Sequence, residues 1–138
     1  MTPFLLDSLH QAMSLSKYRF FMGVVYKEPH SCFRLVDDIF TKVYKIDLAK
    51  NSQEHLSVSD RLAAIQQSLS ASTNRVSSEP LEGDLAIMRT LPWHIGVVIG
   101  EGKLIHVYGS GVSCVEDYDS PILVNRIEGF YRYKGLAK

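Results

Sequence analysis

The spacing of apolar residues changes at Pro80, and this change limits the chain to few fold classes. Before Pro80, apolar residues recur three and four positions apart, which is typical of amphipathic helices. After Pro80, short apolar runs are separated by glycine and proline, which is typical of β-strands. Helices followed by an antiparallel sheet predict an α+β fold, with N-terminal helices packed on a C-terminal sheet.

Three helices are expected before Pro80. The first begins at Thr2 and Pro3, and the second begins with Ser31 as its N-cap. The apolar stripe of the second helix consists of Phe33, Val36, Phe40 and Val43. The third is a modest surface helix in the serine-rich segment 51–80. Strands are expected in the segments 83–90, 93–100, 102–109, 111–116 and 121–133.

Length and charge exclude several classes of protein. A chain of 138 residues that is 46% hydrophobic fits one globular domain spanning residues 1–138. Fifteen basic and fifteen acidic residues cancel, so the chain has no overall field to hold nucleic acid or an anionic membrane. Two cysteines can form one disulfide at most, which argues against a disulfide-stapled secreted scaffold.

The N-terminal segment 1–19 has no basic n-region, and polar residues interrupt its apolar run. It therefore predicts neither a signal peptide nor a membrane span. We expect synthesis in the cytoplasm, so any work outside the cell would need a separate delivery route.

Two histidines lie in neighbouring expected strands, and the hairpin between those strands decides whether they meet. If residues 100–102 form a three-residue loop, Gly96 lies opposite His106, and even-numbered positions share one face. His94 and His106 are then diagonal neighbours, roughly 7–8 Å apart at the backbone, and their side chains can meet. A two-residue loop would shift the register and send the two rings to opposite faces.

Cys32 stands at the start of the second expected helix, where unpaired N–H groups and the helix dipole favour a thiolate. A cysteine beside an imidazole can act as a nucleophile with its base, and a second histidine can orient the first. The candidate catalytic residues are therefore Cys32, His94 and His106. Backbone N–H groups at the same helix start are candidate donors to an oxyanion.

Each of these residues also has a less specific interpretation. Cys32 fits a small core residue, because free cysteines are often buried. His94 and His106 fit partnered polar residues at a sheet edge, or zinc ligands together with Cys32. No short-spaced pair such as CxxC or HxxxH supports a metal site, so none is expected. Cys114 alternates within a strand pattern and is expected to be structural.

Three motifs together resemble the NlpC-type family of papain-like cell-wall cysteine peptidases. They are Cys32 at a helix start, "LEGDLAI" at 81–87 and "HIGVVIGEGKLIHV" at 94–107. The resemblance implies a papain-like fold in which Cys32 is the nucleophile, His94 the base and His106 the residue that orients it. Tyr26 in "GVVY" is similar to the family's tyrosine ahead of the cysteine, which implies a role in stabilising the oxyanion.

The resemblance also implies an activity. It is thiol-dependent cleavage of an amide bond in peptidoglycan stem peptides, next to D-glutamate as the commonest family specificity, with no metal or organic cofactor. The C-terminal "NRIEGFYRY" at 125–133 is similar to the ending of family members from phage tails. That similarity implies phage tail-tip proteins as partners, and a virion or a delivered enzyme at the cell wall as the location.

Two other functions remain open for a chain of this kind. Ser31 and Phe33 stand where the family has aspartate and a small residue. These differences are consistent with a catalytically degenerate structural component of a phage tail that keeps the same fold. A third function is a secreted antibacterial amidase toxin.

Overall fold

The computed structural model describes residues 15–26, 31–49, 57–89, 94–107 and 111–136. Its helices are η1 (Arg19–Phe21), α2 (Ser31–Lys42), α3 (Val58–Ala71) and η2 (Lys134–Leu136). Its strands are β1 (Thr73–Arg75), β2 (Leu85–Met88), β3 (His94–Gly100), β4 (Lys103–Val107), β5 (Ser113–Asp117) and β6 (Ile127–Tyr133). The expected helix at the N-terminus lies outside the described residues.

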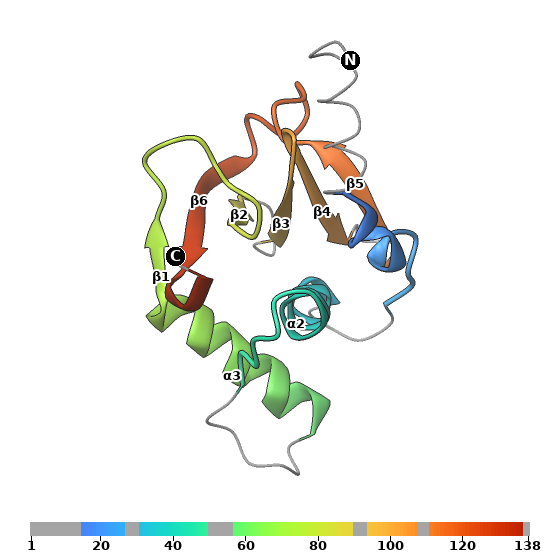
Figure 1. Cartoon of the computed structure of the whole chain (residues 1–138), viewed down its shortest axis with the longest axis vertical. Helices are drawn as coiled ribbons and strands as arrows, with labels where there is room; N and C mark the ends of the chain where they lie inside the picture. Colours follow the sequence, from blue (N-terminus) through green and yellow to red (C-terminus); the bar gives the residue numbers. More distant parts are fainter. Residues whose placement is uncertain (1–14, 27–30, 50–56, 90–93, 108–110, 137–138) are drawn as a thin grey trace, which may run out of the picture.

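The strands form one antiparallel sheet in the order β1-β6-β2-β3-β4-β5. The strands fan over α2, which is seen end-on in Figure 1, while α3 runs below it toward β1. Helices precede the sheet in the chain, so the predicted α+β class is confirmed. Among the described residues, no helix has both the length and the apolar character needed to cross a membrane.

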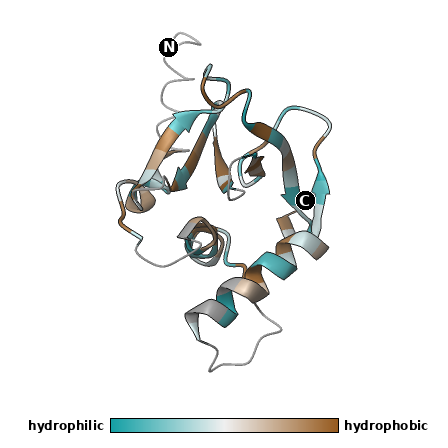
Figure 2. Cartoon of the chain, turned by 180° about the vertical axis from the view of Figure 1, so that it is seen from behind, coloured by the Kyte–Doolittle hydropathy of each residue, from teal (hydrophilic) through white to brown (hydrophobic). Residues whose placement is uncertain are grey.

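The helix α2 begins at Ser31, one residue earlier than an N-cap at Ser31 predicts, and buries one side against the sheet. Its fully buried residues are Leu35, Val36, Ile39 and Phe40. They pack against odd-numbered residues of β3 and β4, such as Val97 and Ile105, to form the main apolar core. Figure 2 shows that the central strands carry long hydrophobic segments, whereas α3 mixes hydrophobic and polar residues. This mixture fits a helix with one face in solvent.

All five predicted strands are present, with shorter limits. The last one starts at Ile127, because the chain from Asp119 to Arg126 makes turns instead. The three-residue strand β1 was not predicted, since its sequence, Thr-Asn-Arg, has no apolar alternation. It pairs with the C-terminal end of β6 and so brings the end of α3 to the sheet edge.

The hairpin between β3 and β4 has the predicted strand register but a different turn. Val97 pairs with Ile105 and Val98 with Leu104, as a three-residue loop would require. However, Gly100 pairs with Lys103, so the loop has two residues and a bulge follows Val98. A bulge adds one residue to one strand and thereby restores the register that a two-residue loop would have shifted. The even-numbered residues of β3 and β4 therefore share a face, as expected.

A buried ion pair fixes the start of β2 to β6. Asp84 is only 1% exposed, and Arg132 donates two hydrogen bonds to its carboxylate, at 2.7 and 2.8 Å. The same carboxylate accepts the backbone N–H of Leu81 at 2.8 Å, which closes the turn ahead of β2. Asp84 thus closes a turn and also makes a cross-strand ion pair.

Candidate active site

Cys32 lies in the first turn of α2, where the helix start meets the beginning of β3. The backbone N–H groups of Cys32, Phe33 and Ile95 lie near its sulfur, where they favour the thiolate. The Ile95 peptide directly follows His94, so the sulfur lies beside the strand end that carries this histidine. The whole residue is 9% exposed and belongs to the main apolar core.

Burial dominates the acidity of this thiol. It raises the pKa of Cys32 above the ordinary value of 9.0, and the three backbone N–H groups lower it by less. The helix start therefore acts in the direction expected from the sequence, but burial outweighs it. The resting site holds a neutral thiol, so a base must remove the proton when the sulfur attacks.

His94, the first residue of β3, has the properties of such a base. Its Nε2 lies 2.9 Å from Nδ1 of His106, and the two rings meet edge to face. Burial lowers the pKa of His94 to about 4, with a smaller contribution from the charge of His106. At neutral pH the His94 ring is therefore unprotonated on one nitrogen and can accept a proton.

His106 is held on the opposite side of the sheet from α2. The residue is 2% exposed, and a Cβ at Gly96 would lie 3.3 Å from its Cβ. Glycine at position 96 thus leaves the space that the His106 ring requires. The structure therefore brings together His94 and His106, which the sequence predicted from the register, and positions the Cys32 sulfur next to the peptide that follows His94.

Glu116 is a member of this network that the sequence interpretation missed. Its Oε2 lies 2.8 Å from Nε2 of His106. His106 of β4 pairs with Cys114 of β5, so Cys114 and Glu116 lie on the face of the sheet that carries His106. The sequence held one indication of this member: Glu116 follows Cys114 by two positions, so the two side chains share a face of the expected strand. The sequence analysis assigned no register between β4 and β5, so this contact was not predicted.

One group of described residues could hold a metal ion. The potential ligand atoms of His106, Cys114 and Glu116 all lie within 4.8 Å of one another. This group shares only His106 with the zinc site considered from the sequence, which used Cys32, His94 and His106. Because Nε2 of His106 is bonded to Glu116, a metal ion would have to replace that hydrogen bond.

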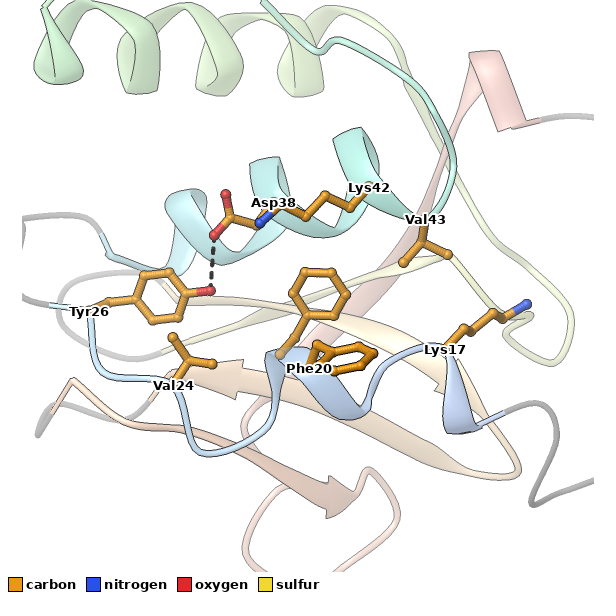
Figure 3. A pocket seen from close by; sticks show the side chains of 8 residues that line it. Lys17, Phe20, Val24, Tyr26, Asp38, Lys42 and Val43 are labelled. Carbon is orange, nitrogen blue, oxygen red and sulfur yellow. Dashed lines mark hydrogen bonds between the residues drawn. The ribbon is translucent and has the colours of Figure 1, made fainter.

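The hydroxyl of Tyr26 donates a hydrogen bond to Asp38 of α2 at 3.1 Å (Figure 3). Tyr26, Asp38, Phe20 and Lys42 line a pocket of about 410 Å³ on this side of the helix. The hydrogen bond directs the phenol proton to the carboxylate. The role of Tyr26 in stabilising an oxyanion stays a prediction.

A second cavity, of about 400 Å³, opens beside His94 between the sheet and α3. Its apolar walls are Phe33, Leu69, Leu85, Ile87 and Ile95. Its polar groups are Gln66, Ser70, Thr73, His94 and Tyr131. An apolar cleft with a few polar groups, one of them His94, is suited to bind a short peptide.

A model of the NlpC/P60 family matches residues 17–132, which is most of the chain. No curated protein gives a significant match. The family is known for cysteine peptidases of the cell wall, and the α+β fold with a cysteine at a helix start agrees with its papain-like architecture. The matched region includes Cys32, His94, His106 and Glu116, and the chain therefore belongs to the NlpC/P60 family.

Proposed function

We propose that the protein is a thiol-dependent endopeptidase that cleaves an amide bond in peptidoglycan stem peptides. The observation that carries the proposal is the hydrogen bond between His94 and His106, together with the place of the Cys32 sulfur near the backbone N–H of Ile95, the residue that follows His94. Family membership supports a cell-wall substrate, and the cleft next to His94 has room for a peptide. Cleavage next to D-glutamate is the specificity that we propose within this class.

The proposed reaction starts from a neutral thiol at Cys32 and a neutral imidazole at His94. His94 takes the Cys32 proton on Nδ1, the nitrogen that does not face His106, while the sulfur attacks the amide carbonyl carbon. Backbone N–H groups at the start of α2 stabilise the oxyanion of the tetrahedral intermediate. His94 then gives its proton to the leaving amine, which breaks the C–N bond and leaves a thioester on Cys32.

Water completes the cycle. His94 accepts a proton from a water molecule, and the resulting hydroxide attacks the thioester carbon. The C–S bond breaks, the sulfur regains its proton through His94, and a carboxylic acid is released. His106 holds the His94 ring at the angle that both proton transfers require.

Digestion of purified sacculi tests the proposal. Soluble peptides should appear with the unchanged protein and be lost in Cys32→Ala and in His94→Ala, and mass spectrometry of the new ends identifies the scissile bond. Cys114→Ala is the matched control, because it removes the other cysteine of the chain. Release of the same peptides by Cys32→Ala would refute the assignment.

A structural role is the second candidate, and Phe33 is the observation that favours it. Phe33 occupies the wall of the cleft at its catalytic end. If the protein instead acts as a degenerate phage-tail component, it should bind tail-tip proteins and leave sacculi intact. Phe33→Ser, which widens the cleft, should then also fail to produce hydrolysis.

We further propose delivery to the cell wall from the cytoplasm, as part of a phage tail.

A further inference from the structure

We propose that Glu116 is a positioning residue that sets the ring tautomers of His106 and His94 for proton transfer from Cys32. The inference rests on the proposed function, because it concerns the same base. It is carried by the two successive hydrogen bonds that join Glu116 to His106 and His106 to His94.

The carboxylate of Glu116 fixes which atoms donate in these two hydrogen bonds. An ionised carboxylate only accepts hydrogen bonds, so the 2.8 Å contact requires a proton on Nε2 of His106. When the His106 ring is neutral, this is its one N–H, and Nδ1 of His106 is then an acceptor. The 2.9 Å contact in turn requires that His94 donates from Nε2. Nδ1 of His94 is left with its lone pair, ready to take the thiol proton.

The opposite order would give the same distances but block the reaction. If His106 carried its proton on Nδ1, it would donate to Nε2 of His94. His94 would then carry its own proton on Nδ1, and it could not accept another there while remaining neutral. Heavy-atom positions do not distinguish these two orders. The carboxylate of Glu116, which accepts from Nε2 of His106, therefore decides between them.

The surroundings of His106 make Glu116 decisive. The His106 side chain is 2% exposed, so bulk water has little access to its ring, whereas Glu116 is 29% exposed and solvent reaches its carboxylate. Two strands hold the contact, because His106 lies on β4 and Glu116 on β5. The residue therefore connects the buried end of the network to the surface without touching the substrate cleft as described.

The tautomers can be measured directly by nitrogen NMR of the histidine rings. The experiment uses Cys32→Ala, which stops turnover, alone and combined with Glu116→Gln or Glu116→Ala. We expect a proton on Nε2 of both rings in Cys32→Ala. With Glu116→Ala the Nδ1–H form of His106 should appear. With Glu116→Gln both forms should be populated, because an amide can donate as well as accept.

Asp117→Asn is the matched control. Asp117 is the next residue on β5, pairs with Lys103 at 2.7 Å and faces away from Glu116 by strand alternation. Its replacement should leave both ring tautomers unchanged. Unchanged tautomers in Glu116→Ala and Glu116→Gln as well would overturn the inference.

Turnover gives an independent measurement. Glu116→Ala should lower kcat by about 10- to 100-fold with little change in KM, the size of loss that follows removal of the outer partner of a metal-bound histidine. Glu116→Gln should lose less, and Asp117→Asn nothing. If the unchanged protein does not hydrolyse sacculi, the proposed function fails, but the NMR result still decides the role of Glu116. Equal kcat values for Glu116→Ala and Asp117→Asn would contradict that role.

Discussion

Nε2 of His94 lies 2.9 Å from Nδ1 of His106, and the ring centroids are 5.0 Å apart at an interplanar angle of 66°. This contact joins the first residue of β3 to a buried residue of β4. It exists because the bulge after Val98 keeps both rings on one face. The contact gives His94 a fixed orientation and engages only one of its two ring nitrogens.

The low pKa of His94 should make the protein less stable in mild acid. In the unfolded chain the ring binds a proton near pH 6.5, but in the folded protein only near pH 4. The contribution of neutral His94 to the free energy of unfolding is therefore complete above pH 6.5. It is lost as the pH falls toward 4, by about 3 kcal/mol at most. Urea unfolding at pH 7.5, 6 and 5 measures this loss. His94→Gln should flatten the dependence, and an equally steep dependence in that variant would assign the effect to other groups.

The raised pKa of Cys32 should appear in its reaction with iodoacetamide. Since burial favours the neutral thiol, we expect the alkylation rate to be low at pH 7 and to rise only at alkaline pH, beyond the ordinary value of 9.0. Mass spectrometry in a Cys114→Ala background follows Cys32 alone. Rapid labelling at pH 6 would show instead that Cys32 and His94 form a preformed ion pair.

Gly96→Ala should reduce activity by displacing His106. The added Cβ would lie 3.1 Å from the carbonyl oxygen of Ile105 and 3.3 Å from Cβ of His106. Overpacking of this kind costs about 1–3 kcal/mol, and here the movable neighbour belongs to the proton-transfer network. Thermal unfolding and kcat measured on the same sample separate the two effects. Gly102→Ala is a control for adding a methyl group, because no atom lies within 4 Å of the new Cβ, although its positive φ adds some strain. Normal turnover in Gly96→Ala would show that His106 tolerates the displacement.

Arg132→Met should destabilise the protein far more than loss of a surface ion pair. It would leave the buried carboxylate of Asp84 without its cationic partner and with only the backbone N–H of Leu81, and breaking a buried ion pair in this way typically costs about 3–5 kcal/mol. Lys103→Met breaks the partly exposed pair with Asp117 and should cost less than about 1 kcal/mol. Urea unfolding of both variants provides the comparison. Similar losses would mean that the Asp84 pair contributes no more than a surface pair.

A chelator should leave turnover unchanged. In the proposed mechanism, a thiol, an imidazole and backbone N–H groups perform every step. Incubation with EDTA before the sacculus assay measures the effect, and added zinc serves to test for recovery. Loss of activity that zinc restores would instead favour a metal-dependent site.

The sequence predicted those parts of the site that local patterns determine. The spacing of apolar residues defined α2 and its start, so Cys32 could be placed at a helix start. The glycines at 100 and 102 placed the hairpin, and with it His94 and His106 on one face. Each of these inferences used residues fewer than fifteen positions apart.

The parts that were missed depend on distant segments. Arg132 pairs with Asp84 across 48 positions, and nothing near either residue indicates its partner. Glu116 meets His106 through the register of β4 and β5, which the sequence analysis did not assign. The degree of burial at Cys32 was also unpredictable, because it arises from the sheet as a whole, and it reversed the expected direction of the thiol pKa.

The bulge between Val98 and Gly100 makes the chemistry depend on a hairpin tip several residues away from it. Gly100, Glu101 and Gly102 all have positive φ, so the tip is a sequence-specific conformation and not a generic loop. Deleting one residue there would turn His106 to the other side of its strand without altering any residue of the network. Loop length at this tip could therefore switch hydrolysis on or off between related chains, and an assay of hydrolysis would report strand registration.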